Sequence, residues 1–415
     1  MKKQNSELNL KEPRIMKPSR KLLAALLLML LPAVTQAQFT FTINNGTITI
    51  TGYTGPSGPV SIPSTISGLQ VTAISRTTFA PPNNVGNISS ISIPDTVTNI
   101  DSDSFVNCYA LTTIIIDAAN PAYSSDGDVF FNKSQTMLLQ YPRAKTGDSF
   151  GVPSTVTNIG PTAFFCCSLK SISIPATVTA IALGAFRDCS GLTNIAVDAA
   201  NAFYRSKGGI LFDQNQTSII CFPGGLGGAY AIPSSITNIA TYAFEGCQIT
   251  NVTIPDSVCA IEDVAFGNCW HLVNITIPGS VRSVGSEAFY MCLLRGIYFE
   301  GNEPSGRYSE IFDQVPGTVY YLPKTIGWTN VYGGLHTALW NPQALTGRDS
   351  FGVRTNRFGF NITGTTNIPI VVEACTNLGS DWIPLQSVSL TNGSFYFSDP
   401  QWTNYPGRFY RFRSP

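Results

Sequence analysis

A short pattern of apolar and polar positions recurs along most of this chain. Each copy opens with an apolar residue and a proline, continues as Val-Thr-x-Ile or a close variant, and precedes an Ala-Phe-x-x-Cys-type phrase. The closest copies lie 22 or 23 residues apart, and a fixed period of this length predicts a solenoid of stacked coils. The copies begin at Ile93, Val152, Ile174, Ile232, Ile254 and Ile277, with a degenerate one at Ile62.

The apolar positions of one copy predict which side chains face inward. Val258 and Ile261 point inward from a short extended stretch, and Phe266 packs a corner beside a small alanine. Ile275 and Ile277, two residues apart, form the inward face of a strand. No single coil can bury such a face alone, so neighbouring coils must cover it. The pattern therefore predicts short parallel strands stacked on one another.

A second, longer repeat is superimposed on the first. Residues 120–142 align with residues 201–223 at a constant offset of 81, and each copy follows an Asp-Ala-Ala sequence. Each copy contains two β-rich runs, which we interpret as an elaborated coil with a hairpin. The two elaborated coils are placed at 117–151 and 198–231.

The ends of the repeat region have different patterns. Phe39, Phe41 and Ile43 alternate with polar residues before an Asn-Gly turn, which predicts a hairpin cap over residues 38–60. The solenoid is placed at 61–298, and the proline- and tryptophan-containing stretch 299–343 as a C-terminal cap and linker. Residues 344–415 show short alternating runs separated by turn residues, which predicts a small all-β, sandwich-like domain. The expected fold class is therefore mainly β.

Residues 1–37 resemble a signal peptide. Three basic residues, Lys17, Arg20 and Lys21, precede the apolar run 22–31, and small residues at Thr35-Gln36-Ala37 suit cleavage near Ala37. The run is shorter than the ~20 residues that span a bilayer, although an uncleaved signal anchor is the alternative. No second apolar run of spanning length follows, so the mature chain is expected to lack a transmembrane helix and to be secreted or held at the cell surface.

Charge excludes one class of partner. Residues 38–415 carry 18 Lys and Arg against 23 Asp and Glu, a net charge of −5. Nucleic acid binding requires clustered Lys and Arg, so no nucleic acid partner is expected. Charged residues make up only 12% of the chain, so Thr, Ser and Asn carry much of the surface.

The ten cysteines follow the repeat. Six of them lie three residues after the repeated phenylalanine, a position that stacks into a column in a solenoid. A small thiol packs well there, which favours a reduced, buried column over a disulfide framework. The six are Cys108, Cys167, Cys189, Cys247, Cys269 and Cys292.

The full phrase Ile-Pro-x-Ser/Thr-Val-Thr-x-Ile-x-x-x-Ala-Phe-x-x-Cys-x-x-Leu resembles the BspA-like leucine-rich repeat family of bacterial secreted and surface proteins. The resemblance covers roughly residues 60–300. It implies a leucine-rich-repeat-type solenoid and adhesion to proteins or to other cells, and it supplies no catalytic residues. Residues 344–415 lie outside it.

The sequence offers little for chemistry. The only two histidines, His271 and His336, fall in predicted loop or cap segments with no catalytic partner. The stretch Asp126-Gly127-Asp128 resembles part of a calcium loop, but its counterpart at offset 81 is Lys207-Gly208-Gly209. We therefore expect no catalytic residue, no metal and no cofactor.

The outward positions of the strands suggest a recognition surface. They form two columns of uncharged polar side chains, which can hydrogen-bond a protein strand or a glycan but cannot move protons at neutral pH. We predict a binding protein whose partner is a protein or a polysaccharide. The candidate residues are Thr113, Ser171, Asn194, Asn251, Asn274, Ser173, Thr253, Thr276 and Tyr298.

Two alternatives remain open. A carbohydrate-active enzyme would need acids that converge in the two inserts, where Asp117 and Asp198 are equivalent, although recurrence at one repeat position first indicates turn capping. A structural cell-envelope component would use residues 344–415 as its attachment module.

Overall fold

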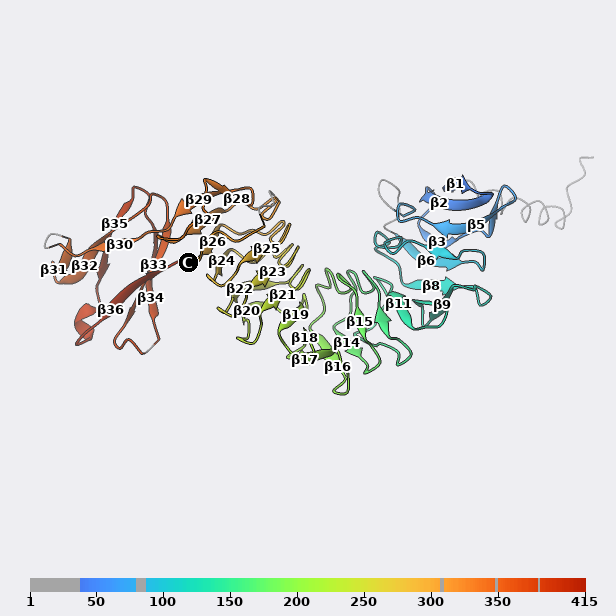
Figure 1. Cartoon of the computed structure of the whole chain (residues 1–415), viewed down its shortest axis with the longest axis horizontal. Coiled ribbons are helices and arrows are strands. Elements are labelled where there is room, and N and C mark those ends of the chain that lie inside the picture. Colours follow the sequence, from blue (N-terminus) through green and yellow to red (C-terminus); the bar gives the residue numbers. More distant parts are fainter. Residues whose placement is uncertain (1–37, 80–86, 307–309, 348–349, 380) are drawn as a thin grey trace, which may run out of the picture.

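The computed structural model describes residues 38–79, 87–306, 310–347, 350–379 and 381–415. The predicted signal peptide, residues 1–37, lies outside the described residues. The described chain consists of strands and one short 3-10 helix, η1 (Trp402–Asn404), and it contains no helix with the length and apolar character to span a bilayer. The mainly β fold expected from the sequence is confirmed: a curved stack of coils leads from β1 to a C-terminal pair of sheets (Figure 1).

Each coil contributes one strand to a first column of parallel strands, as at Ile172 opposite Ile195. The first column comprises β3 (Gly58–Ser61), β6 (Ile88–Ile93), β8 (Thr113–Ile116), β12 (Ser149–Gly151), β14 (Ser171–Ile174), β16 (Asn194–Val197), β20 (Gly228–Ala231), β22 (Ile249–Thr253), β24 (Asn274–Ile277), β26 (Gly296–Phe299), β27 (Thr318–Tyr321) and β29 (Leu335–Leu339). The backbone pairing of this column breaks between β8 and β12, between β16 and β20, and between β22 and β24.

Shorter strands form a second column, where the Val-Thr-x-Ile phrase passes. The second column comprises β5 (Leu69–Ile74), β7 (Asn99–Ile100), β11 (Met137–Gln140), β13 (Asn158–Ile159), β15 (Ala180–Ile181), β19 (Ser218–Cys221), β21 (Asn238–Ile239), β23 (Ala260–Ile261) and β25 (Ser283–Val284). The inward positions expected from the sequence, among them Val258 and Ile275, are buried.

The repeated phenylalanines stack along the corner of the solenoid. Ring centroids of Phe164 and Phe186 lie 5.4 Å apart, and those of Phe244 and Phe266 lie 4.8 Å apart. Phe222 starts the second of these runs, 4.9 Å from Phe244. Stacked rings bury large apolar areas and add favourable ring contacts, so this ladder is a main source of coil-to-coil stability.

The two inserts divide the stack into three blocks. In the first insert β9 (Tyr123–Asp126) and β10 (Val129–Asn132) form a hairpin, and in the second β17 (Tyr204–Lys207) and β18 (Ile210–Asp213) do the same. Phe130 packs in the core of the first block, whereas its neighbours Val129 and Phe131 pack in the core of the second. In β18, Leu211 packs in the core of the second block, and its neighbours Ile210 and Phe212 pack in the core of the third. We call β10 and β18 the dividing strands, since each is buried on both faces.

A buried asparagine anchors each insert. The Asn201 amide donates to the Pro175 and Val178 carbonyls, both at 2.9 Å, and its side-chain oxygen accepts from two backbone N–H groups. Asn120 makes the equivalent four hydrogen bonds in the first insert. Both asparagines are fully buried, so their polar atoms are satisfied within the fold.

At the N-terminal end, β1 (Phe39–Asn44) and β2 (Thr47–Tyr53) form the hairpin, and β4 (Thr65–Ile66) pairs with β5. Asn45 and Gly46 take positive φ values of 49° and 80°, as a two-residue hairpin turn requires. The apolar face predicted for this hairpin is covered only in part: Phe39 is buried, but Ile43 is 58% exposed because the hairpin tip extends past the first coil.

The stack continues beyond residue 298, where the sequence analysis ended it. β27 and β29 pair in parallel with the strands before them, and Phe312 extends the phenylalanine ladder 5.4 Å from Phe289. The repeated phrase is lost here because the last coils are closed by aromatic side chains such as Trp328 and by β28 (Val331–Tyr332), which pairs antiparallel with β29.

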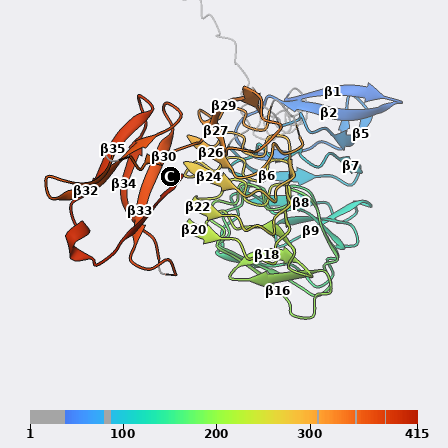
Figure 2. The ribbon, with the colours of Figure 1, turned by 60° about the vertical axis from the view of Figure 1, so that its left-hand side comes forward.

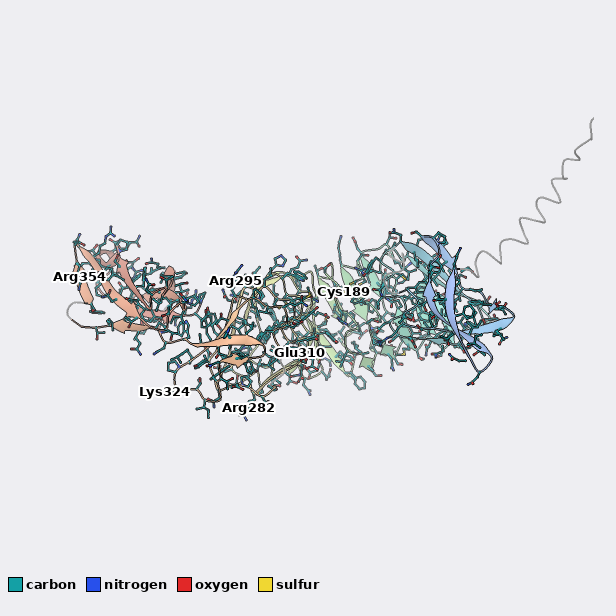
Figure 3. All side chains as sticks on the ribbon, turned by 90° about the horizontal axis from the view of Figure 1, so that it is seen from above. Cys189, Arg282, Arg295, Glu310, Lys324 and Arg354 are labelled. Carbon is teal, nitrogen blue, oxygen red and sulfur yellow. The ribbon has the colours of Figure 1, made fainter. Side chains whose placement is uncertain are left out.

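Two sheets face each other at the C-terminal end and form the sandwich. One sheet contains β30 (Gln343–Leu345), β31 (Phe351–Arg354), β32 (Arg357–Thr363) and β35 (Ser394–Asp399); the other contains β33 (Pro369–Cys375), β34 (Ile383–Ser389) and β36 (Phe409–Arg413). The sandwich core includes Tyr298 and Tyr320 of the solenoid, so the sandwich packs beside the first column (Figure 2). Seen from above, the molecule is elongated, with Cys189 in the stack and Arg354 at the far end of the sandwich (Figure 3).

Candidate recognition groove

The nine predicted recognition residues do not form one continuous surface. The inserts interrupt the first column, because β8 does not pair with β12 and β16 does not pair with β20. Thr113 therefore lies in the first block, and Ser171, Ser173 and Asn194 lie together in the second. The Asn194 amide donates to the Ser171 hydroxyl at 2.9 Å, so part of its hydrogen-bonding capacity is used within the protein.

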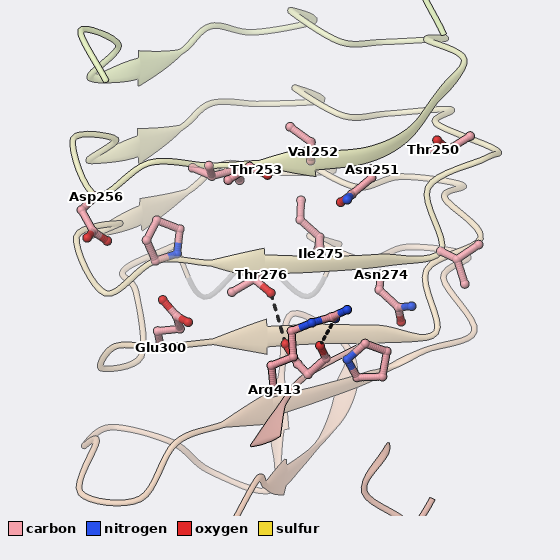
Figure 4. A pocket seen from close by; sticks show the side chains of 15 residues that line it. Thr250, Asn251, Val252, Thr253, Asp256, Asn274, Ile275, Thr276, Glu300 and Arg413 are labelled. Carbon is pink, nitrogen blue, oxygen red and sulfur yellow. Dashed lines mark hydrogen bonds between the residues drawn. The ribbon is translucent and has the colours of Figure 1, made fainter. Parts of the chain in front are cut away.

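Four of the nine converge in one groove of the third block. Asn251 and Thr253 on β22 lie beside Asn274 and Thr276 on β24, and together they line a groove of about 640 Å³ (Figure 4). The tail of β36, with Arg413, Ser414 and Pro415, forms the opposite wall. The hydroxyls of Thr276 and Ser414 lie 3.4 Å apart, which joins the tail to the solenoid face.

The amides of Asn251 and Asn274 are available to a ligand. Neither side chain has a hydrogen-bond partner in the part of the chain that the structure describes, and Asn251 is exposed. An amide both donates and accepts, so two of them on adjacent strands can bind a peptide backbone or sugar hydroxyls. The groove is thus polar at this end.

The prediction that Tyr298 belongs to the exposed recognition surface is wrong. Tyr298 points outward from its strand, but only 4% of it is exposed, because it stacks on Tyr320 at 4.9 Å and the sandwich covers both rings. It lines instead a second cavity of about 190 Å³, which adjoins the groove. Six aromatic residues line this cavity: Tyr298, Phe299, Tyr320, Tyr321, Trp340 and Phe412.

Two carboxylates lie at the other end of the groove. Partial desolvation and the nearby Asp256 carboxylate raise the pKa of Glu300. Arg413 is the one cation among the residues that line the two cavities, and it pairs with the buried Glu373 at 2.5 Å. Figure 4 shows Asp256 and Glu300 on the same side of the groove, with the guanidinium of Arg413 directed away from them.

Sequence reasoning missed the carboxylates and the aromatic cavity. Glu300 follows β26 and Asp256 follows β22, so both fall just past the columns that the repeat pattern defines. The wall formed by residues 413–415 comes from a strand more than a hundred residues later in the chain, and no periodicity connects the two. The aromatic pair Tyr298 and Tyr320 on adjacent strands was the one available signal that something covers this face.

The remaining candidates for chemistry are structural in this fold. Asp117 accepts a hydrogen bond from the Ala119 N–H, and Asp198 accepts one from the Ala200 N–H, each at 2.8 Å. Each aspartate therefore caps its own turn. Among the described residues, no three His, Cys, Asp or Glu side chains gather in a way that could hold a metal ion.

The cysteines of the column are buried and free, as expected. The thiols of Cys247, Cys269 and Cys292 donate to the carbonyls of Phe222, Phe244 and Phe266 at 3.2, 3.1 and 2.9 Å, which links each coil to the one before it. The sulfur atoms of Cys167 and Cys189 lie 3.5 Å apart, and the hydrogen bond between them lowers the pKa of Cys167. Burial raises the pKa of Cys108, and that of Cys221 outside the column, to about 12. Such thiols remain protonated at neutral pH and are not nucleophiles.

Comparison with known proteins gives a consistent answer for the repeat region. The family model described as BspA type leucine rich repeat region (6 copies) matches residues 59–142, 143–223 and 229–312. No curated protein matches the chain.

Several solved structures are similar. A leucine-rich repeat protein from Eubacterium ventriosum is 22% identical over 57% of this chain and 67% of its own, with a TM-score of 0.37. A leucine rich cell surface protein from Faecalibacterium prausnitzii is 22% identical over 68% of this chain and 93% of its own, with a TM-score of 0.38. A leucine-rich repeat protein from Bacteroides ovatus is 24% identical over 68% of this chain and 70% of its own, with a TM-score of 0.32.

Proposed function

Since this chain belongs to the BspA type leucine-rich repeat family, we propose that it is an exported binding protein that holds a protein partner on the outward face of its first column. The groove of the third block is the main contact, and the polar side chains of the first two blocks extend the surface. Residues 1–37 direct export, and the protein acts outside the cell or at its surface. A polysaccharide is the other class of partner that these side chains suit.

One observation carries the proposal. Asn251, Thr253, Asn274 and Thr276 meet in a groove of about 640 Å³, the size of a small-ligand or peptide site, and the two amides are without internal partners among the described residues. Amides without internal partners, here on two neighbouring strands of the first column, bind a ligand without first breaking internal hydrogen bonds.

A paired variant tests it. Asn251→Arg combined with Asn274→Arg fills the groove with long charged side chains and leaves the inward positions unchanged. We expect this variant to lose at least tenfold in affinity for partners found on a protein array and a glycan array. Asn215→Arg, an exposed change in the turn between β18 and β19, is the matched control. Equal binding by the native chain and the groove variant would contradict the proposal.

One geometric feature supports a second candidate, a glycoside-cleaving enzyme. Such enzymes use one carboxyl with a raised pKa as the acid and a second carboxylate nearby, and Glu300 and Asp256 share these properties at the edge of the groove. Incubation with a panel of oligosaccharides tests this candidate: release of reducing sugar that Glu300→Gln abolishes would favour it over simple binding.

A further inference from the structure

The groove and the aromatic cavity meet at the junction of the solenoid and the sandwich. Thr276, Glu300, Arg413 and Ser414 line both, so the two spaces form one continuous site with an open polar part and a narrower aromatic part. We call the combined space the junction site. It is built from four segments: the β22–β24 face, the ends of β26 and β27, Trp340 just after β29, and the tail of β36.

The narrow part is suited to an alkyl chain and a positive charge. Its volume of about 190 Å³ admits one long side chain. Its aromatic wall comes from Tyr298, Tyr320, Trp340 and Phe412, and aromatic ring faces attract cations. The rings of Phe299 and Tyr321 pack instead on Trp328 on the solenoid side. Tyr298, which lines it and is 4% exposed, has a hydroxyl without a hydrogen-bond partner in the described structure. That hydroxyl is fully enclosed and lies over Gly296, so Tyr298 contributes its ring, not its hydroxyl, to the wall of the cavity.

The unpaired charges at the junction site are negative, which favours a ligand with a positive charge. Glu300 and Asp256 have no ion-pair partner among the described residues, whereas Arg413 is held by Glu373. A ligand cation would therefore meet two uncompensated carboxylates. A neutral sugar would leave both of them unpaired.

We infer that the junction site binds a lysine side chain carried by an extended peptide segment of a protein partner. The alkyl chain lies among the aromatic rings, the ammonium group lies next to Glu300, and the peptide backbone runs along the Asn251 and Asn274 amides. Lysine fits better than arginine because its charge is compact and its stem is narrow. The peptide component rests on the proposed function, whereas the cation component rests on the cavity alone.

Calorimetric titration of the whole chain with two short peptides tests the inference. Each peptide has nine Gly and Ser residues around one central position, which is lysine in the first and norleucine in the second, with both termini blocked. We expect the lysine peptide to bind at least tenfold more tightly than the norleucine peptide, and its affinity to fall as salt rises.

Two variants locate the binding. Glu300→Gln keeps the shape of the side chain and removes its charge, and it should weaken the lysine peptide at least fivefold. Glu287→Gln makes the same change at an exposed position of the neighbouring coil, outside both cavities, and should alter affinity less than twofold. Thermal melts followed by circular dichroism confirm that both variants fold.

Equal affinity of the two peptides, absence of binding by both, or an unchanged Kd in Glu300→Gln would each overturn the inference. A neutral hexasaccharide that binds the native chain and Glu300→Gln equally would assign the site to glycans instead. A different result would contradict the proposed function alone. If the Asn251→Arg, Asn274→Arg variant keeps its protein partners while the native chain binds the lysine peptide, the cation site is supported and the proposal of an extended binding face is wrong.

Discussion

The cysteine column shows how a single residue type serves the solenoid. A thiol is small enough for the corner and still donates a hydrogen bond to the phenylalanine carbonyl of the preceding coil, as Cys269 does to Phe244. Alanine would leave the volume of the sulfur atom empty and would lose the donor. The column is therefore a packing and hydrogen-bonding device, and burial raises the pKa of four of its thiols, those of Cys108, Cys189, Cys247 and Cys269.

Thiol reactivity tests this description. Of the ten cysteines, Cys259 is the exposed one, and Cys166 is half-exposed with a pKa that burial raises to about 11. With an aromatic disulfide reagent at pH 8, we expect one thiol per molecule to react quickly and the others only after urea is added. Cys259→Ser should remove the fast phase. Several fast thiols in the native protein would contradict the buried column.

The insert anchors provide a second prediction at this scale. Asn201→Ala removes four hydrogen bonds and leaves buried backbone groups unpaired, so it should lower the free energy of unfolding by about 3 kcal/mol. Asn251→Ala, at an exposed position, should change it by less than about 0.5 kcal/mol. Urea denaturation measures both, and equal effects would show that the anchor contributes nothing.

At the scale of elements, the phenylalanine ladder ties coil to coil. Phe266 is fully buried between Phe244 and Phe289, at ring distances of 4.8 and 5.3 Å. Phe266→Ala should lower the free energy of unfolding by about 3–5 kcal/mol, because it removes a large buried ring and leaves a cavity. Phe203→Ala, at a half-exposed position, should cost under about 1 kcal/mol. Denaturant midpoints at unchanged slope provide the measurement.

The elements were predictable to the extent that they repeat. Each coil presents the same inward residues, so the period, the column of cysteines and the ladder could be read from the sequence. The strands β9 and β17 could not be predicted from the sequence, because their residues, such as Tyr123 and Ser125, are polar and half-exposed. These strands are held in place by contacts with residues far away in the sequence, which no local pattern reveals. One example is the hydrogen bond that the Tyr204 hydroxyl accepts from the Ile181 N–H at 2.9 Å.

At the scale of the whole molecule, side chains bridge the block boundaries. Across the second insert, Arg187 forms a two-point ion pair with Glu245 at 2.7 and 2.9 Å, although the two residues are 58 positions apart. The Arg187 guanidinium also lies 4.5 Å from the centre of the Tyr242 ring. Across the first insert, Thr162 donates to Asp103 at 3.3 Å.

The ion pair at the second boundary is expected to matter for stability. The Glu245 carboxylate is buried while Arg187 keeps 31% of its side chain exposed, so Arg187→Ala should lower the free energy of unfolding by about 2 kcal/mol, less than for a fully buried pair. Lys170→Ala breaks an exposed pair with Asp148 and should change it by under about 0.5 kcal/mol. If urea denaturation gave the same small loss for both, the bridge would be dispensable.

The proposed recognition surface was predictable only in its parts. The polar columns follow from the alternation of each strand, which is why Asn251 and Thr276 could be named in advance. Their enclosure in a groove depends on where the sandwich packs, and Tyr298 was misplaced for the same reason. Local periodicity determines which face a side chain is on, whereas a covering domain determines whether that face meets solvent.

The dividing strands have a consequence for how such a protein can change length. Each of them offers one apolar face backward and one forward, so an 81-residue unit ends in a surface that the next unit already matches. Duplication of such a unit would repeat the same apolar contacts at each new junction, and the caps at both ends would need no alteration. The length of the solenoid could thus change in steps of one unit, while the end that carries the groove stays the same.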